Sequence, residues 1–201
     1  MDYVETTWLV RRTFPVSPAF DSTYMEMITG PVDRAGTDIY ILSRSSCTDD
    51  VDLYIRDDGL FFRIEKNMFG DLVIGTSPYP LPFGGYYKLF DFSLPAGVKF
   101  TPFEFSTETD DLWCNFWITC ESIGTETVNS QNHVYENCIK FRLTVYGNYT
   151  PRVTGETVTW SAMETLWFGE NTGPVKGVSE TYSDGVLVES YVRMMMHLDR
   201  W

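Results

Sequence analysis

The chain has 201 residues, 43% of them hydrophobic, and contains 14 Phe, 12 Tyr and 6 Trp. Its 15 basic and 28 acidic residues give a formal net charge of −13, which repels nucleic-acid backbones and anionic membrane surfaces. Lys and Arg form no cluster in the sequence, so we exclude nucleic-acid binding, and no apolar run approaches the roughly 18 residues of a membrane span. The many aromatic residues favour a β protein, because aromatic side chains pack well on a pleated, half-buried surface.

The first residues, Met1–Glu5, contain no basic stretch followed by an apolar run, so they do not form a signal peptide. Either the protein is not exported, or the chain begins after a signal has been removed. The localisation is therefore unknown from the sequence, and a cell-envelope or extracytoplasmic location is favoured if a signal was removed.

Alternation of apolar and polar residues is the dominant pattern and predicts a series of β-strands. In Cys138–Tyr146 it indicates one buried and one wetter face, with Ile139, Phe141, Leu143 and Val145 opposite Lys140, Arg142, Thr144 and Tyr146. Further strands are predicted at Tyr3–Arg12, Thr23–Thr29, Asp38–Ser43, Asp71–Gly75, Tyr86–Phe92, Leu112–Glu121 and Thr157–Phe168. Glycine, proline and Asp/Asn residues separate them at Gly30–Pro31, Pro78–Gly85, Pro95–Gly97 and Asn129–Asn132. A short helical turn is considered only at Ser17–Ser22.

The stretch Val51–Ile64 is predicted to be a hairpin. Asp58 and Gly59 suit a two-residue type I′ turn, since both central residues of that turn need positive φ. With this turn Ile55 faces Phe62 and Leu53 faces Ile64. All four apolar residues then share one face, so the pattern and the turn agree.

The linker-like stretch Pro78–Gly85 is the best candidate for a domain boundary. It contains Leu81 and Phe83, which suggest a packed crossing rather than a free linker. We therefore predict a single all-β, antiparallel domain over residues 1–201, with few or no helices and with residues 78–85 as a weak subdivision.

The best indication of a ligand surface is in the strand predicted at Leu112–Glu121. Trp113, Asn115 and Trp117 share one face there, opposite the apolar residues Phe116 and Ile118. Tryptophan rings beside an amide could form platforms for sugar rings, in a lectin or in a glycosidase with paired carboxylates. Packing against a neighbouring strand explains the same pattern and is the favoured alternative.

The four cysteines are predicted to be mostly free, partly buried thiols. Cys114 and Cys120 lie about 20 Å apart along one predicted strand, too far to bond. Cys120 and Cys138 are symmetric about a loop at Asn129, but Cys120 alternates with apolar residues and Cys138 with charged ones. A bulge could still bring that pair together, so a Cys120–Cys138 disulfide remains the alternative, and Cys47 is undecided.

No metal, cofactor or catalytic site is predicted. His133 and His197 stand alone, and no Cys-x-x-Cys occurs, so a zinc site lacks ligands. The acidic clusters Asp49–Asp52, Asp57–Asp58 and Asp110–Asp111 lack the spacing of a calcium loop and are interpreted as solvated turns. There is no phosphate-binding glycine motif either. Whether the protein is an enzyme is uncertain, and the sequence favours a non-enzymatic role.

The stretch Thr165–Lys176 is interpreted as structural. Its aromatic residues are expected to anchor a strand end in the core, and its glycines and proline to turn the chain into a last hairpin. These residues are Trp167, Phe168, Gly169, Gly173 and Pro174.

The last hairpin is predicted around Tyr182–Val186. A two-residue loop at Asp184–Gly185 would place Glu180 opposite Glu189, which is unfavourable. We therefore expect a loop of three or four residues with Gly185 left-handed, and the register stays open.

Several motifs in order resemble an uncharacterised β-domain of bacterial envelope and lipoprotein-like proteins, mainly over residues 80–193. They are Pro80–Tyr87, Gly124–Val128 followed by Tyr135–Phe141, and Trp167–Lys176. The chain departs from that pattern at His133–Val134, where a glycine is usual, and at Tyr87, where tryptophan is common. The resemblance implies a single, strongly curved antiparallel sheet, a half-barrel or open barrel similar to lipoprotein carriers, and it implies no catalytic residues.

The predicted function is a non-enzymatic extracytoplasmic binding or structural module. Its concave face would hold an apolar ligand or a covering segment, or the protein would bind a protein partner. The alternatives are an assembly subunit of a phage or surface appendage that uses strand edges and aromatic patches, and a carbohydrate-binding protein or glycosidase.

Overall fold

A computed structural model describes residues 4–13, 22–34, 37–44, 51–56, 59–63, 86–108, 112–130, 133–170 and 172–200. These residues form one antiparallel sheet of twelve strands, and no helix occurs among them. The first six strands are β1 (Val4–Thr13), β2 (Ser22–Arg34), β3 (Thr37–Arg44), β4 (Val51–Arg56), β5 (Gly59–Arg63) and β6 (Tyr86–Asp91). The second six are β7 (Lys99–Glu108), β8 (Leu112–Asn129), β9 (Val134–Pro151), β10 (Val158–Gly169), β11 (Gly173–Ser183) and β12 (Val186–Arg200). The predicted all-β antiparallel class is confirmed.

The sheet consists of two meanders joined by the first and last strands. Its spatial order is β6-β5-β4-β3-β2-β1-β12-β11-β10-β9-β8-β7, so β1 and β12 pair in the middle and β6 and β7 occupy the two edges. β6 and β7 are nevertheless consecutive along the chain, separated only by residues 92–98. Eight peptide steps can span about 28 Å, whereas a flat sheet of twelve strands would be about 50 Å wide. The sheet must therefore curl until its two edges approach each other.

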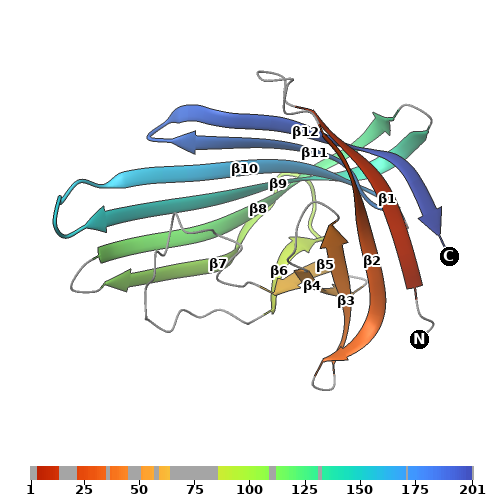
Figure 1. Cartoon of the computed structure of the whole chain (residues 1–201), viewed down its shortest axis with the longest axis horizontal. Helices are drawn as coiled ribbons and strands as arrows, with labels where there is room; N and C mark the ends of the chain where they lie inside the picture. Colours follow the sequence, from red (N-terminus) through yellow and green to blue (C-terminus); the bar gives the residue numbers. More distant parts are fainter. Residues whose placement is uncertain are drawn as a thin grey trace.

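Figure 1 shows the result of this curling. Strands β7–β12 lie side by side as a long layer, and β1–β3 turn away from it so that β4–β6 come to lie below that layer. The sheet stays open because β6 and β7 are not hydrogen-bonded to each other. The connection between them is held on β8 by two backbone bonds, from Gly97 N to Ser122 O and from Ser122 N to Val98 O.

The main core fills the inner face of the curl. Its fully buried members come from β6–β10 and include Leu89, Phe90, Phe103, Phe116, Ile118, Phe141, Leu166 and Phe168. The inner face of β9 is the one predicted from its alternation, since Phe141 is buried and Ile139, Leu143 and Val145 pack against the same cluster. A second, smaller cluster contains Val128, Cys138, Trp167, Val175 and Met195.

The first predicted hairpin is present, but its predicted register is wrong. Leu53 pairs with Phe62, Ile55 with Leu60 and Arg56 with Gly59, so Gly59 is a paired residue of β5 and not a residue of the turn. Gly59 is instead a buried strand residue opposite Asp91 of β6. A Cβ atom on Gly59 would lie 2.5 Å from the carbonyl oxygen of Phe90, so glycine is needed for the close approach of β6 and not for the turn.

The last hairpin has the two-residue loop that the sequence disfavoured. Asp184 (φ 48°) and Gly185 (φ 78°) are both left-handed, as a type I′ turn requires. The expected conflict between Glu180 and Glu189 is avoided by a bulge at Val188, which places Ser190 opposite Glu180 and Glu189 opposite Thr181. As expected, Glu180 and Glu189 do not face each other, but a bulge separates them and not a longer loop.

Two of the strands contain a proline. β7 was not among the predicted strands; it contains Pro102, which a bulge between Phe100 and Phe103 accommodates on this edge strand. Gly30 and Pro31 were assigned to a gap but lie inside β2, where the register with β3 shifts between Thr29 and Val32. Ser22 begins β2, and the rest of the helical turn considered at Ser17–Ser22 lies outside the described residues, as do Asp71–Gly75 and the weak boundary at 78–85.

Candidate ligand-binding face

The candidate site is the outer face of β7–β11, the side opposite the main core. β8 supplies Trp113, Asn115 and Trp117 to this face, because Cys114, Phe116 and Ile118 alternate with them and are buried on the inner side. The ladder between β8 and β9 has no bulge in this region, so each β8 residue shares its face with its β9 partner. The predicted grouping of the two tryptophans with Asn115 therefore holds in the fold.

Trp117 lies against Tyr146, its direct partner on β9. The two rings are stacked, with centroids 5.1 Å apart and an angle of 16° between their planes. Both side chains are half-buried, so the pair keeps part of its surface toward solvent. Because stacked rings face each other, the pair offers a ligand its outer ring faces and edges, with the indole N–H and the phenol hydroxyl as polar tips. We call this pair the aromatic platform.

A polar row runs beside this platform. Asn115 pairs with Asn148 of β9 and with Ser106 of β7. The Ser106 hydroxyl donates a hydrogen bond of 2.9 Å to the amide oxygen of Asn115, which orients the Asn115 side chain with its N–H groups as donors. Platform and polar row are therefore adjacent rows of one face.

Trp113 is at the far end of the same face. It pairs with Thr150 of β9 and with Glu108 of β7. The hydroxyls of Thr150 and Thr157 are 2.8 Å apart and hydrogen-bonded to each other, and Arg152 forms an ion pair with Glu108. Polar groups at this end are thus engaged with one another.

The inner face is packed by its own side chains. Phe90 contacts Phe141 and Phe168 with ring centroids 5.5 and 5.0 Å apart, and Phe92 contacts the same two rings. Gly147 lets Phe116 and Trp160 stack across it, since a Cβ atom there would lie 3.2 Å from the Trp160 ring. A cavity of about 10 Å³ near Val175 and Met195 has room for about one water molecule.

The three described cysteines are free thiols. Cys120 pairs with Leu143 and Cys138 with Glu126, so the two are not cross-strand partners. Burial raises the pKa of Cys120 to about 12 and also raises the pKa values of Cys114 and Cys138. All three are therefore protonated at neutral pH, and a protonated thiol is a poor nucleophile and metal ligand. Cys47 lies outside the described residues.

The stretch Thr165–Lys176 places its two aromatic residues on opposite sides of the sheet. Phe168 belongs to the main core, and Trp167, 4% exposed, belongs to the second cluster. The Trp167 ring lies between the ammonium groups of Lys140 and Lys176, 4.7 and 4.4 Å from its centroid, and its N–H donates a 3.1 Å hydrogen bond to Glu126. The hydrogen bonds from Lys140 and Trp167 lower the pKa of Glu126.

The turn after this strand uses the predicted small residues. Gly173 has φ 86°, and Gly169 leaves room for Val175, whose Cγ1 would lie 3.1 Å from an added Cβ. Pro174 pairs with Phe168 where the register shifts, between Trp167 and Phe168. The bulge there allows the chain to accept a proline inside the ladder.

Groups of acidic, cysteine and histidine side chains able to hold a metal ion do not occur in the part of the chain that the structure describes. His133 is exposed against Tyr135, with ring centroids 4.4 Å apart, and His197 pairs with Leu9 in the β1–β12 ladder. Among the described residues there is also no helix that is long and apolar enough to cross a membrane.

Tyr146, Asn148 and Ser106 were not identified as site residues from the sequence. Alternation did place Tyr146 on the wetter face of its strand, which was a usable signal. What the sequence lacked was the register between strands, which decides that Tyr146 lies against Trp117 and Asn148 beside Asn115.

No protein-family model matches the chain, and no curated protein matches it. Among solved structures, the chain is similar to one described as "a putative lipoprotein" from Parabacteroides distasonis. The two are 16% identical with a TM-score of 0.49, and the match covers 96% of this chain and 94% of the other. At this level of likeness the match says nothing about what this protein binds.

Proposed function

We propose that this protein is a non-enzymatic binding module that recognises a carbohydrate chain on the outer face of β7–β11. The observation that carries the proposal is the stacked Trp117–Tyr146 pair beside the amide row of Asn115 and Asn148. Sugar rings present apolar C–H faces and polar hydroxyl edges. The outer ring faces and edges of the stacked pair suit the first, and adjacent amide and hydroxyl groups suit the second.

The absence of a reaction is part of the proposal. Glu104 and Glu108 are the carboxylates that β7 places on this face, opposite Trp117 and Trp113. Four residues along a strand separate them by about 13 Å. The two carboxyl groups of a glycosidase are at most about 9.5 Å apart. Glu108 is also paired with Arg152, so this face is better suited to binding a glycan than to cleaving it.

An apolar ligand in the concave face has less support. The aromatic rings of β6, β9 and β10 contact one another there, so the described inner face is already filled by protein. The location outside the cytoplasm remains part of the proposal and rests on the sequence resemblance. Native mass spectrometry of protein purified without detergent tests the inner-face alternative: a retained lipid would favour it over the outer-face proposal.

A glycan array of neutral and acidic polysaccharides tests the proposal directly. We expect the wild-type protein to bind and Trp117→Ala to lose at least tenfold in affinity, the loss expected when a contacting aromatic side chain is removed. Val153→Ser, at a 94% exposed loop position, is the matched control and should bind as wild type. An array without hits for the folded wild-type protein would overturn the proposal.

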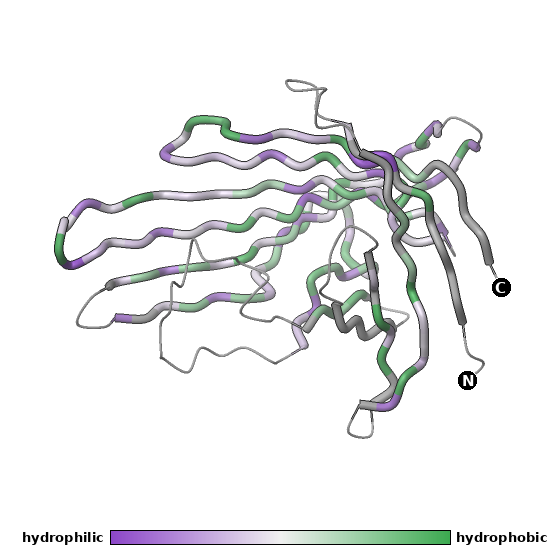
Figure 2. The backbone as a smooth tube through the Cα atoms, viewed as in Figure 1, coloured by the Kyte–Doolittle hydropathy of each residue, from purple (hydrophilic) through white to green (hydrophobic). Residues whose placement is uncertain are grey.

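An assembly subunit is the second candidate, and one observation favours it. Val186, Leu187 and Val188 at the start of β12 are 65%, 45% and 60% exposed, and Figure 2 shows the hydrophobic segment at this hairpin. Consecutive exposed aliphatic residues often mark a protein contact. Light scattering during gel filtration tests it: a complex that Leu187→Ser dissociates would support assembly, and a monomer at high concentration would oppose it.

A further inference from the structure

Resting on the proposed function, we infer that the ligand lies across the strands, from Trp117 on β8 to Tyr182 on β11, and is a neutral glycan of several sugar units. The register carries this inference. Trp117 pairs with Tyr146, Tyr146 with Ser161, and Ser161 with Tyr182. None of these three ladders shifts at these positions, so the four side chains form one row on one face.

The row is long enough for more than one ring. It crosses three strand spacings, which is about 14 Å. Its two ends are aromatic, Trp117 stacked on Tyr146 at one end and Tyr182 at the other, while the intervening position is the small side chain of Ser161. A single sugar ring covers about one aromatic ring, so contact with both ends requires a chain of linked units.

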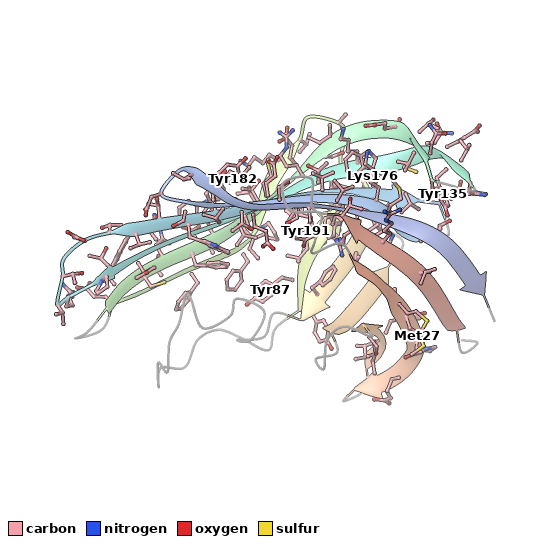
Figure 3. The ribbon with its side chains drawn as sticks, turned by 45° about the horizontal axis from the view of Figure 1, so that its top comes forward. Met27, Tyr87, Tyr135, Lys176, Tyr182 and Tyr191 are labelled. Carbon is pink, nitrogen blue, oxygen red and sulfur yellow. The ribbon has the colours of Figure 1, made fainter. Side chains whose placement is uncertain are left out.

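Tyr182 is held in place as the distal end of this row. Its hydroxyl donates a 3.1 Å hydrogen bond to Glu180. The turn that follows is attached to β10, because the Asp184 carboxylate accepts hydrogen bonds from the backbone N–H and the hydroxyl of Thr159. Figure 3 shows Tyr182 on the same side of the sheet as Lys176 and on the opposite side from Tyr87, a residue packed against the main core.

The alternative course along β8, from Trp117 to Trp113, is less suitable. Between these rings lies Asn115, and the far end at Trp113 is bordered by the Glu108–Arg152 ion pair and the Thr150–Thr157 hydroxyl pair. The row across the strands begins with two rings already in contact. Its geometry therefore favours a chain perpendicular to the strands.

The charges on the row select a neutral ligand. Glu104 pairs with Trp117 at one end, and Glu180 accepts the hydrogen bond of Tyr182 at the other. A carboxylated or sulfated sugar would meet a negative charge at each end of the row. With a formal net charge of −13, the whole chain adds to that repulsion.

The experiment is isothermal titration with oligosaccharides of two to six units, prepared from the neutral glycan that gives the strongest array signal. We expect affinity to rise with chain length. Tyr182→Ala should lower the affinity of the six-unit chain about tenfold and leave the two-unit fragment unchanged. Trp117→Ala should weaken both. Tyr182→Phe keeps the ring and should retain most of the effect of chain length, with thermal unfolding confirming that both Tyr182 variants are folded.

Three outcomes would overturn the inference while leaving the proposed function standing. They are equal affinity for short and long chains, a length effect that Trp113→Ala removes and Tyr182→Ala does not, and preference for acidic over neutral glycans. Failure of every glycan to bind would instead overturn the proposed function.

Discussion

The inner and outer faces of β8–β10 are both rich in aromatic residues, yet the rings of the two faces pack differently. On the inner face, Phe90, Phe141 and Phe168 contact one another mostly edge to face and are nearly inaccessible to solvent. On the outer face, Trp117 and Tyr146 stack with nearly parallel rings, stay half-buried and have Asn115 and Asn148 in the next row. The number of aromatic residues does not separate the core from the proposed binding surface; the side of the strand and the neighbours of each ring do.

The largest difference between the two faces should be in stability. Phe141→Ala removes a fully buried ring from the centre of the aromatic cluster and should lower the free energy of unfolding by about 3–5 kcal/mol. Trp117→Ala on the outer face should cost much less, because half-buried rings leave no enclosed cavity. Urea denaturation of both variants measures this, and equal losses would contradict the distinction.

Trp167 sharpens the comparison, because it is buried although it lies away from the main core. Trp167→Ala should lower the free energy of unfolding by about 3 kcal/mol, through the lost packing in the second cluster. It also removes the hydrogen bond to Glu126 and the ring between Lys140 and Lys176. Denaturation combined with the glycan assay checks this: a stable variant that no longer bound the glycan would move Trp167 into the binding site.

A substitution at Gly59 tests whether β5 and β6 lie as close together as the structure shows. Gly59→Ala places a Cβ atom 2.5 Å from the Phe90 carbonyl oxygen and should cost about 2 kcal/mol through overpacking. If Gly59 were instead a turn residue, a change of Asp58 to glycine would partly compensate. Thermal unfolding of Gly59→Ala alone and with Asp58→Gly distinguishes the two, since the described register predicts no rescue.

The smallest expected effect concerns pH and the outer face. The pKa of Glu126 lies below its ordinary value of 4.5, chiefly because Lys140 and Trp167 donate hydrogen bonds to its carboxylate. A carboxyl group with a lowered pKa in the folded state stabilises the protein above about pH 4.5, and this contribution is lost as pH falls through the lower folded-state pKa. The side chain is substantially exposed, so the effect should be small. Unfolding from pH 7 to pH 3 should show a shallower loss for Glu126→Gln than for wild type.

Local pattern predicted much of the fold. Alternation in residues 138–146 predicted which side of β9 is buried, and the tryptophans of β8 were placed correctly opposite Phe116 and Ile118. The pattern failed where proline or glycine had two possible roles. Gly30–Pro31 was assigned to a gap but lies in a bulge inside β2, and Gly59 was assigned to a turn but makes room for a neighbouring strand. In each case a contact with another strand decided the role.

By itself, the sequence determined the β class and the buried faces of β8 and β9, while the exclusion of nucleic acid as a ligand stays a prediction from the charge. These depend on alternation within a strand and on total charge, which are local or additive properties. Only the tertiary structure decided that β1 pairs with β12, that the short link between β6 and β7 curls the sheet, and that Trp117, Tyr146 and Tyr182 form one row. Register between strands depends on which side chains fit across a ladder, and residues far apart in the chain supply that information.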